Sequence, residues 1–182
     1  MGPCCLVFGV SGVGKTSACS AFTQRHPNWL FVSASTLLKA AKGATGERLR
    51  TADSQSIVDN QLVLADAVRQ FRSGRVERPM LLDAHAVIDN DRELVRVPVE
   101  VIRALQPSLF VLLEAPAQVV LERRLADTRQ RPVRDVASIE RELAAERSAV
   151  ADYSVDVGVE LLKANVTSDF VLESVFKEII LD

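Results

Sequence analysis

Short runs of apolar residues alternate along the whole chain with longer stretches in which apolar positions recur at helical spacing. This alternation predicts strands separated by helices, which is typical of a parallel sheet covered on both faces. Five strands are expected, over residues 4–8, 29–33, 80–82, 109–113 and 159–163. Helices are expected over residues 17–25, 35–41, 53–71, 98–105, 117–127, 138–157 and 168–181, with a loop over 43–46. The sequence therefore predicts an α/β fold, a single doubly wound five-stranded parallel sheet with right-handed connections.

Residues 9–16 read Gly-Val-Ser-Gly-Val-Gly-Lys-Thr and lie between the first expected strand and the first expected helix. A strand, a glycine-rich turn and a helix start in this order are what a phosphate-binding P-loop requires. A flexible turn that binds nothing is the alternative, but the flanking elements favour nucleotide binding. The residues expected to bind the nucleotide are Gly9, Gly12, Val13, Gly14, Lys15, Thr16 and Ser17.

Two side chains of this motif carry separate roles. Lys15 adds positive charge for the β- and γ-phosphates of a nucleotide, and the Thr16 hydroxyl is placed to ligate Mg²⁺. We expect Lys15 to face solvent in the empty site and to support no core contact. ATP and Mg²⁺ are the cofactors that this motif predicts.

Asp83 ends the third apolar run, where a carboxylate is costly unless it has a partner. Mg²⁺ is that partner in P-loop enzymes, so we expect Asp83 and Thr16 to form a metal site; an aspartate that caps a turn is the alternative. Ligands of doubly wound sheets bind beyond the carboxyl ends of the strands. His85 should face the same crevice, as a functional residue or as a structural histidine.

Composition restricts the classes of protein that fit. A chain of 182 residues suits one domain with a sizeable core, so we expect a single domain over residues 1–182. The net charge of −2 gives no basic footprint for direct nucleic-acid binding or for a membrane surface. Three cysteines fit neither a disulfide framework nor a zinc site. With no signal-peptide pattern and no membrane-spanning apolar run, the prediction is a cytoplasmic protein.

Residues 122–134 hold five arginines in a chain that is slightly acidic overall. Phosphoryl transfer uses such a cluster, because arginine offers permanent charge and a planar donor fork to the transferring group. A solvated, charged helix end is the alternative, although few glutamates lie here to pair with the arginines. We expect an arginine lid over about residues 127–137 that closes over substrate and excludes water. Arg147 is a weaker candidate.

Several segments together resemble archaeal-type adenylate kinases: residues 9–16, 82–88, 105–107, 111–114, 122–131 and 147–153. The resemblance covers most of the chain and extends to adenylate-kinase-like ATPases of ribosome assembly, which share an Asp-x-His after the third strand. It implies that the P-loop holds donor ATP, that the strand-end aspartate organises Mg²⁺ and that lid arginines neutralise the transferring phosphate. The catalytic residues that it implies are Lys15, Asp83, Arg124, Arg129 and Arg131.

The acceptor site is expected in a helical insert over about residues 34–74, with Ser35, Lys39 and His85 as candidate contacts. Lys39 stands where many adenylate kinases have an arginine; it keeps the charge but loses the bidentate fork. Pro132 replaces the aspartate usual in the lid pattern. The base of the acceptor is not indicated, because the stretch over residues 39–53 matches the family poorly.

The leading hypothesis is a nucleoside monophosphate kinase that moves the γ-phosphoryl of MgATP to an acceptor phosphate, with AMP favoured. No catalytic base is required, because an acceptor phosphate is largely ionised near neutral pH. The alternatives are an ATPase switch with a protein or ribonucleoprotein partner, and a kinase of another small metabolite. A GTPase is disfavoured, since no Asn-Lys-x-Asp sequence follows the fourth strand.

Overall fold

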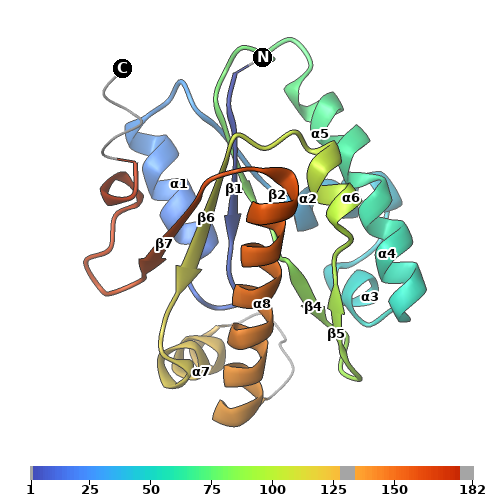
Figure 1. Cartoon of the computed structure of the whole chain (residues 1–182), viewed down its shortest axis with the longest axis vertical. Helices are drawn as coiled ribbons and strands as arrows, with labels where there is room; N and C mark the ends of the chain where they lie inside the picture. Colours follow the sequence, from blue (N-terminus) through green and yellow to red (C-terminus); the bar gives the residue numbers. More distant parts are fainter. Residues whose placement is uncertain (1, 128–133, 177–182) are drawn as a thin grey trace.

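The structure is a computed structural model that describes residues 2–127 and 134–176. Its central sheet consists of β1 (Cys4–Phe8), β2 (Leu30–Ser33), β3 (Met80–Asp83), β6 (Leu109–Glu114) and β7 (Leu161–Asn165). The strands are all parallel and lie in the order β2-β3-β1-β6-β7 (Figure 1). The prediction of a five-stranded parallel sheet is confirmed.

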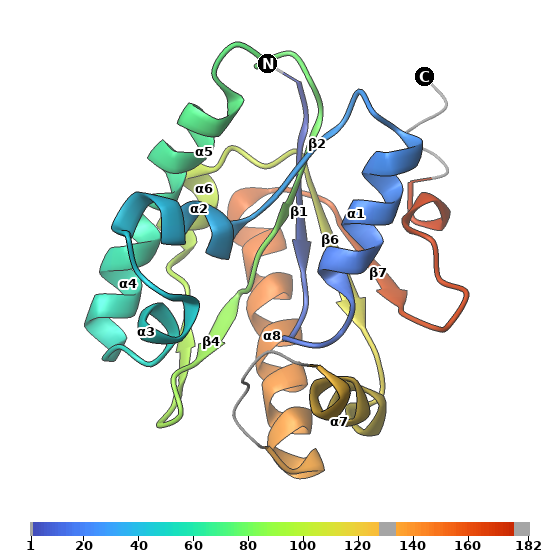
Figure 2. The ribbon, with the colours of Figure 1, turned by 180° about the vertical axis from the view of Figure 1, so that it is seen from behind.

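Helices follow the strands on both sides of the sheet. They are α1 (Lys15–Arg25), α2 (Ala34–Lys42), α3 (Gly46–Arg50), α4 (Ser54–Leu62), α5 (Leu64–Arg72), α6 (Val99–Ala104), α7 (Ala117–Ala126) and α8 (Val136–Val157). α8 crosses in front of the sheet in Figure 1, whereas α1 lies in front in the reverse view of Figure 2. Among the described residues, no helix combines the length and apolar composition that crossing a membrane would need.

Two apolar cores, one on each face, hold the layers together. Because successive side chains of a strand point to opposite faces, Leu6 and Phe8 of β1 enter one core and Cys5 and Val7 enter the other. The first core contains buried residues of α2, α5, α6 and the second half of α8. The second contains buried residues of α1, α7 and the first half of α8. Each strand of the centre is thus buried on both faces, which explains its nearly continuous apolar sequence.

An antiparallel hairpin that the sequence reading missed follows β3. It pairs β4 (Val87–Asp89) with β5 (Leu94–Arg96). The turn between them uses Asn90, whose side-chain oxygen accepts the N–H groups of Arg92 and Glu93, and Asp91, which has a positive φ of 75°. Asparagine and aspartate suit such turns, but strands of three residues give too short an apolar pattern to be recognised.

The single helix expected over residues 53–71 is wrong. The chain forms α4 and α5, which are separated at Val63. The buried positions nevertheless keep a spacing of three to four residues across the break, at Ile57, Gln61, Leu64 and Val68. The loop expected over residues 43–46 ends one residue earlier than anticipated, since α3 begins at Gly46 behind a Thr45 side chain that accepts the N–H of Arg48.

The α-helix expected to begin at Ser168 is also wrong within the described residues. The Thr167 hydroxyl donates to the Asp169 carboxylate at 2.7 Å and closes a turn there, and a 3₁₀ segment follows at Leu172–Ser174. Phe176 packs its ring against that of Phe22 on α1, with centroids 5.4 Å apart. Residues 177–181 of that expected helix lie outside the described residues.

Candidate nucleotide-binding site

The glycine-rich loop connects the carboxyl end of β1 to the first turn of α1 (Figure 2). Gly9, Gly12 and Gly14 have φ values of 145°, 88° and 113°, which side-chain-bearing residues rarely adopt. A Cβ atom on Gly9 would also lie 2.5 Å from the Leu113 carbonyl oxygen. The glycines therefore permit a loop that ends at a helix N-terminus, where backbone N–H groups are available to anions.

Lys15 lies inside this loop and is only 5% exposed, so the expectation that it faces solvent is wrong. Its ammonium donates to the carbonyl of Gly9 at 2.5 Å and to that of Val10 at 3.3 Å. The same nitrogen is 3.6 Å from Oδ1 of Asp83. A buried ammonium needs partners for its three donors; the backbone of the curled loop supplies two carbonyls, and Asp83 of β3 supplies a carboxylate.

Thr16 and Asp83 meet at the ends of α1 and β3. The Thr16 hydroxyl donates to Oδ2 of Asp83 at 2.6 Å, and Asp83 is buried. Within the described ranges, no three His, Cys, Asp or Glu side chains gather as a metal-ligand cluster. A hydroxyl and a carboxylate are nevertheless hard oxygen donors, and Mg²⁺ commonly takes one or two protein ligands together with waters and substrate phosphates. The two side chains fit a magnesium ion bound in that way.

Glu146 of α8 is a site residue that the sequence reading missed. It is 1% exposed, and its Oε1 accepts the N–H groups of Gly9 and Ala86, each at 3.0 Å. Its Oε2 accepts the N–H of Val87 at 2.8 Å. Burial raises the pKa of Glu146, while nearby Lys15 and these three N–H groups favour its charged form. One carboxylate thus fastens the first glycine of the P-loop to the backbone that follows Asp83.

A signal for this residue is present in the sequence. The buried positions of α8 recur every three or four residues: Ile139, Glu142, Leu143, Glu146, Ala149, Val150 and Tyr153. Two glutamates therefore fall on the apolar stripe of an otherwise amphipathic helix. Carboxylates are rarely buried without partners, so their position on the stripe indicates paired groups.

Two neighbouring arginines of α7 hold the outer part of the loop. Nε of Arg124 donates to the Ser11 carbonyl at 2.8 Å, and its terminal nitrogen pairs with the buried carboxylate of Glu142 at 2.8 Å. Arg123 donates to the Val13 carbonyl at 2.7 Å. Arg124 is therefore engaged in positioning the loop, and its catalytic role stays a prediction.

Of the expected lid over residues 127–137, the structure describes Asp127 and the residues from Arg134 onward. Arg129 and Arg131 lie outside the described residues. Arg134 pairs with Asp89 at 2.7 Å and also with Asp91, both on the β4–β5 hairpin. Hydrogen bonds from Arg50 of α3, and a further hydrogen bond from Arg134, hold the pKa of Asp91 below its usual value. The hairpin thus connects the start of α8 to the end of α3.

The candidate acceptor contacts lie on the segments that follow β2 and β3. Ser33 and Asp83 are register partners in β2 and β3, so Ser35 and His85 each follow by two residues from neighbouring strand ends. Lys39 is exposed in the second turn of α2, with its side chain along the start of α3, where a Cβ atom on Gly46 would lie 3.0 Å from the ammonium. Arg147 pairs with Glu114 at the end of β6, at 2.6 Å. Ser35, His85 and Arg147 therefore belong to segments at the carboxyl ends of the strands, whereas Lys39 lies farther along α2, beside α3.

This fold and loop define the class of P-loop kinases, and solved structures support the fold. A shikimate kinase from Bacteroides thetaiotaomicron has a TM-score of 0.61 at 15% identity, covering 96% of this chain and 94% of that chain. A gluconokinase from Sinorhizobium meliloti has a TM-score of 0.53 at 16% identity, covering 97% and 87%. At such identities the likeness concerns the fold alone.

Sequence relatives identify the family. Residues 8–140 match the family described as an AAA domain. The chain is 31% identical to an adenylate kinase of Methanothermobacter thermautotrophicus over 160 residues, 84% of each protein. It is 28% identical to an adenylate kinase of Pyrococcus abyssi over 158 residues, 82% of this chain and 79% of the relative. The chain therefore belongs to the AAA domain family and to the adenylate-kinase-like nucleoside monophosphate kinases, as an ATP-dependent phosphotransferase.

Replacing Glu146 by glutamine tests its structural role. The amide nitrogen cannot accept a hydrogen bond, so at least one of the N–H groups of Gly9, Ala86 and Val87 loses its partner. We expect the free energy of unfolding, measured by urea denaturation, to fall by about 1–3 kcal/mol. The matched control is Glu140→Gln on the exposed face of the same helix, which should change stability by less than about 0.5 kcal/mol. Equal stability of the two variants would contradict the assignment.

Proposed function

We propose that the protein transfers the γ-phosphoryl group of MgATP to a nucleoside monophosphate, with AMP as the favoured acceptor. The observation that carries this proposal is the convergence of Lys15, Thr16 and Asp83 at the mouth of the P-loop. Support for the acceptor comes from the two relatives called adenylate kinases, which align with more than four fifths of this chain. Nucleotides are therefore the proposed substrates.

The donor side of the reaction uses the loop and its two neighbouring strands. Backbone N–H groups of the loop after Gly9 bind the phosphates of ATP, since the N–H of Gly9 itself donates to Glu146, and Lys15 turns from the Gly9 carbonyl toward the β- and γ-phosphates. Thr16 and Asp83 hold Mg²⁺ through their oxygens. When bound, the ion supplies positive charge against the charge of the phosphates. Arg124, Arg129 and Arg131 add the charge that the transferring group requires.

The acceptor side needs alignment rather than proton removal. The acceptor phosphate is held by Ser35, Lys39 and His85, close to the carboxyl ends of β2 and β3. Because that phosphate is already ionised, catalysis consists of placing it in line with the γ-phosphoryl, neutralising charge and excluding water. The insert of α2 to α5 is the part of the chain that binds this substrate.

A coupled assay with purified protein, MgATP and each nucleoside monophosphate in turn tests the function. The expected result is two ADP formed for each ATP consumed in the presence of AMP, with slower turnover of the other monophosphates. Release of inorganic phosphate that is independent of every monophosphate would reject the kinase in favour of an ATPase switch. Turnover only with another small metabolite would assign a different acceptor.

Lys39→Ala tests the acceptor contact. Loss of one charged hydrogen bond to the acceptor phosphate should raise the apparent KM for AMP by about 10-fold or more, while the KM for ATP hardly changes. Steady-state kinetics with each substrate varied separately provide the measurement. Lys163→Ala, which removes an exposed lysine on β7, is the control. A KM for AMP that stays at the control value would remove Lys39 from the acceptor site.

Asp83→Asn tests the metal site. The amide keeps the size of the side chain but removes the charge that attracts Mg²⁺, so we expect activity to require a several-fold higher Mg²⁺ concentration. ATP affinity measured without metal should change less than turnover does. An unchanged Mg²⁺ titration of activity would show that the carboxylate is structural.

A further inference from the structure

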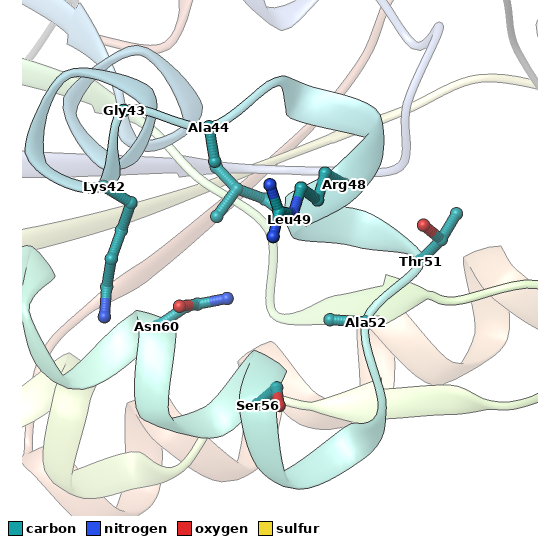
Figure 3. Close-up of a pocket in the computed structure, with 9 residues that line it drawn as sticks. All are labelled: Lys42, Gly43, Ala44, Arg48, Leu49, Thr51, Ala52, Ser56 and Asn60. Atoms are coloured by element: carbon teal, nitrogen blue, oxygen red, sulfur yellow. The ribbon is translucent and has the colours of Figure 1, made fainter.

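A pocket of about 490 Å³ lies in the insert, between the end of α2, α3 and α4 (Figure 3). Its lining includes Lys42, Arg48, Leu49, Ser56 and Asn60. Figure 3 shows Arg48 and Asn60 pointing toward its middle from opposite sides, with Lys42 extending from α2 toward α4. The volume lies within the range of small-molecule sites. None of the residues assigned above to the donor, metal or acceptor contacts lines this pocket.

All charged side chains that line the pocket are positive. No aspartate or glutamate is among its lining residues. In the part of the chain that the structure describes, neither Lys42 nor the guanidinium of Arg48 has an ion pair or side-chain hydrogen bond. The nearby carboxylates are engaged locally: Asp53, the N-cap of α4, accepts both the N–H and the hydroxyl of Ser56, and Asp59 accepts from the Gln55 amide. Two cations therefore remain available in a chain whose net charge is −2.

The other lining groups indicate which anion fits. The Asn60 amide can donate a hydrogen bond to the same ligand that the two cations attract, whereas the Ser56 hydroxyl already donates to Asp53 at 2.6 Å. An arginine fork matches the geometry of phosphate oxygens, and a lysine adds a mobile point charge. No aromatic side chain lines the pocket for a base to stack on. The chemistry is that of a phosphate group rather than of a nucleobase.

We propose that this pocket binds a phosphate group of a small phosphorylated molecule through Lys42 and Arg48. Lys39 lies three residues before Lys42 on α2, about 4.5 Å along the helix axis. The phosphate can therefore come from two sources. The bound group is either a second phosphate of the acceptor, an assignment that rests on the proposed function, or the phosphate of a separate ligand that binds to the insert.

Calorimetric titration with inorganic pyrophosphate tests the pocket. Saturating ATP with a metal chelator occupies the P-loop and prevents phosphoryl transfer, so the titration reports sites outside the P-loop. The wild-type chain should bind pyrophosphate, and Lys42→Gln combined with Arg48→Gln should weaken that binding by about 10-fold or more. Arg92→Gln combined with Lys163→Gln removes two exposed cations elsewhere and should leave it unchanged. Absence of binding to the wild type, or equal binding to the Lys42 and Arg48 variant, overturns the proposal.

Repeating the titration with AMP present separates the two sources. If AMP displaces pyrophosphate, and a nucleoside 3′,5′-bisphosphate has a lower KM than AMP only when Lys42 and Arg48 are intact, the pocket extends the acceptor site. If pyrophosphate binds equally with and without AMP, the pocket takes a separate ligand. Both results support phosphate binding at Lys42 and Arg48. Failure of transfer to every acceptor would reject the proposed function. The titration with pyrophosphate in the presence of the chelator would still decide whether Lys42 and Arg48 bind phosphate.

Discussion

The structure of the site depends on one buried carboxylate, that of Glu146. Burying a carboxylate costs free energy unless its oxygens accept hydrogen bonds, and here they accept three backbone N–H groups. The donors belong to the start of the P-loop and to the segment that leaves β3. This single side chain of α8 therefore fixes two separate stretches of backbone between which the nucleotide phosphates and the metal are proposed to lie.

Cationic side chains hold the P-loop through hydrogen bonds to its carbonyl groups. Arg123 and Arg124 donate to carbonyls of the loop, and the Arg124–Glu142 pair is buried. Inside the loop, Lys15 uses the carbonyls of Gly9 and Val10. The curvature that phosphate binding requires is thus held by contacts within the chain, so that a ligand need not impose it. Preorganisation of this kind lowers the cost of binding and of stabilising the transition state.

The sequence predicted the parts of the site that follow from local pattern. Glycine spacing and flanking elements located the P-loop, and the rule that ligands bind at the carboxyl ends of parallel strands correctly placed Asp83 beside Thr16. The inward position of Lys15 was not predictable, because it depends on carbonyls that only the folded loop presents. Glu146 was missed for a similar reason: its partners are backbone groups 59 to 137 residues away in the sequence. The β4–β5 hairpin was not predicted, because strands of three residues are too short to show an alternation of apolar and polar positions.

The most direct test of this account is the activity of Lys15→Met, which keeps the hydrophobic stem and removes the ammonium. Circular dichroism and urea denaturation should show a folded protein, destabilised by about 1–3 kcal/mol because Asp83 and the loop carbonyls lose a buried partner. Phosphoryl transfer from MgATP should fall by roughly 10²-fold or more, since one preorganised cation is missing from the transition state. A folded variant with near-normal turnover would contradict the assignment of this loop as the site of phosphoryl transfer.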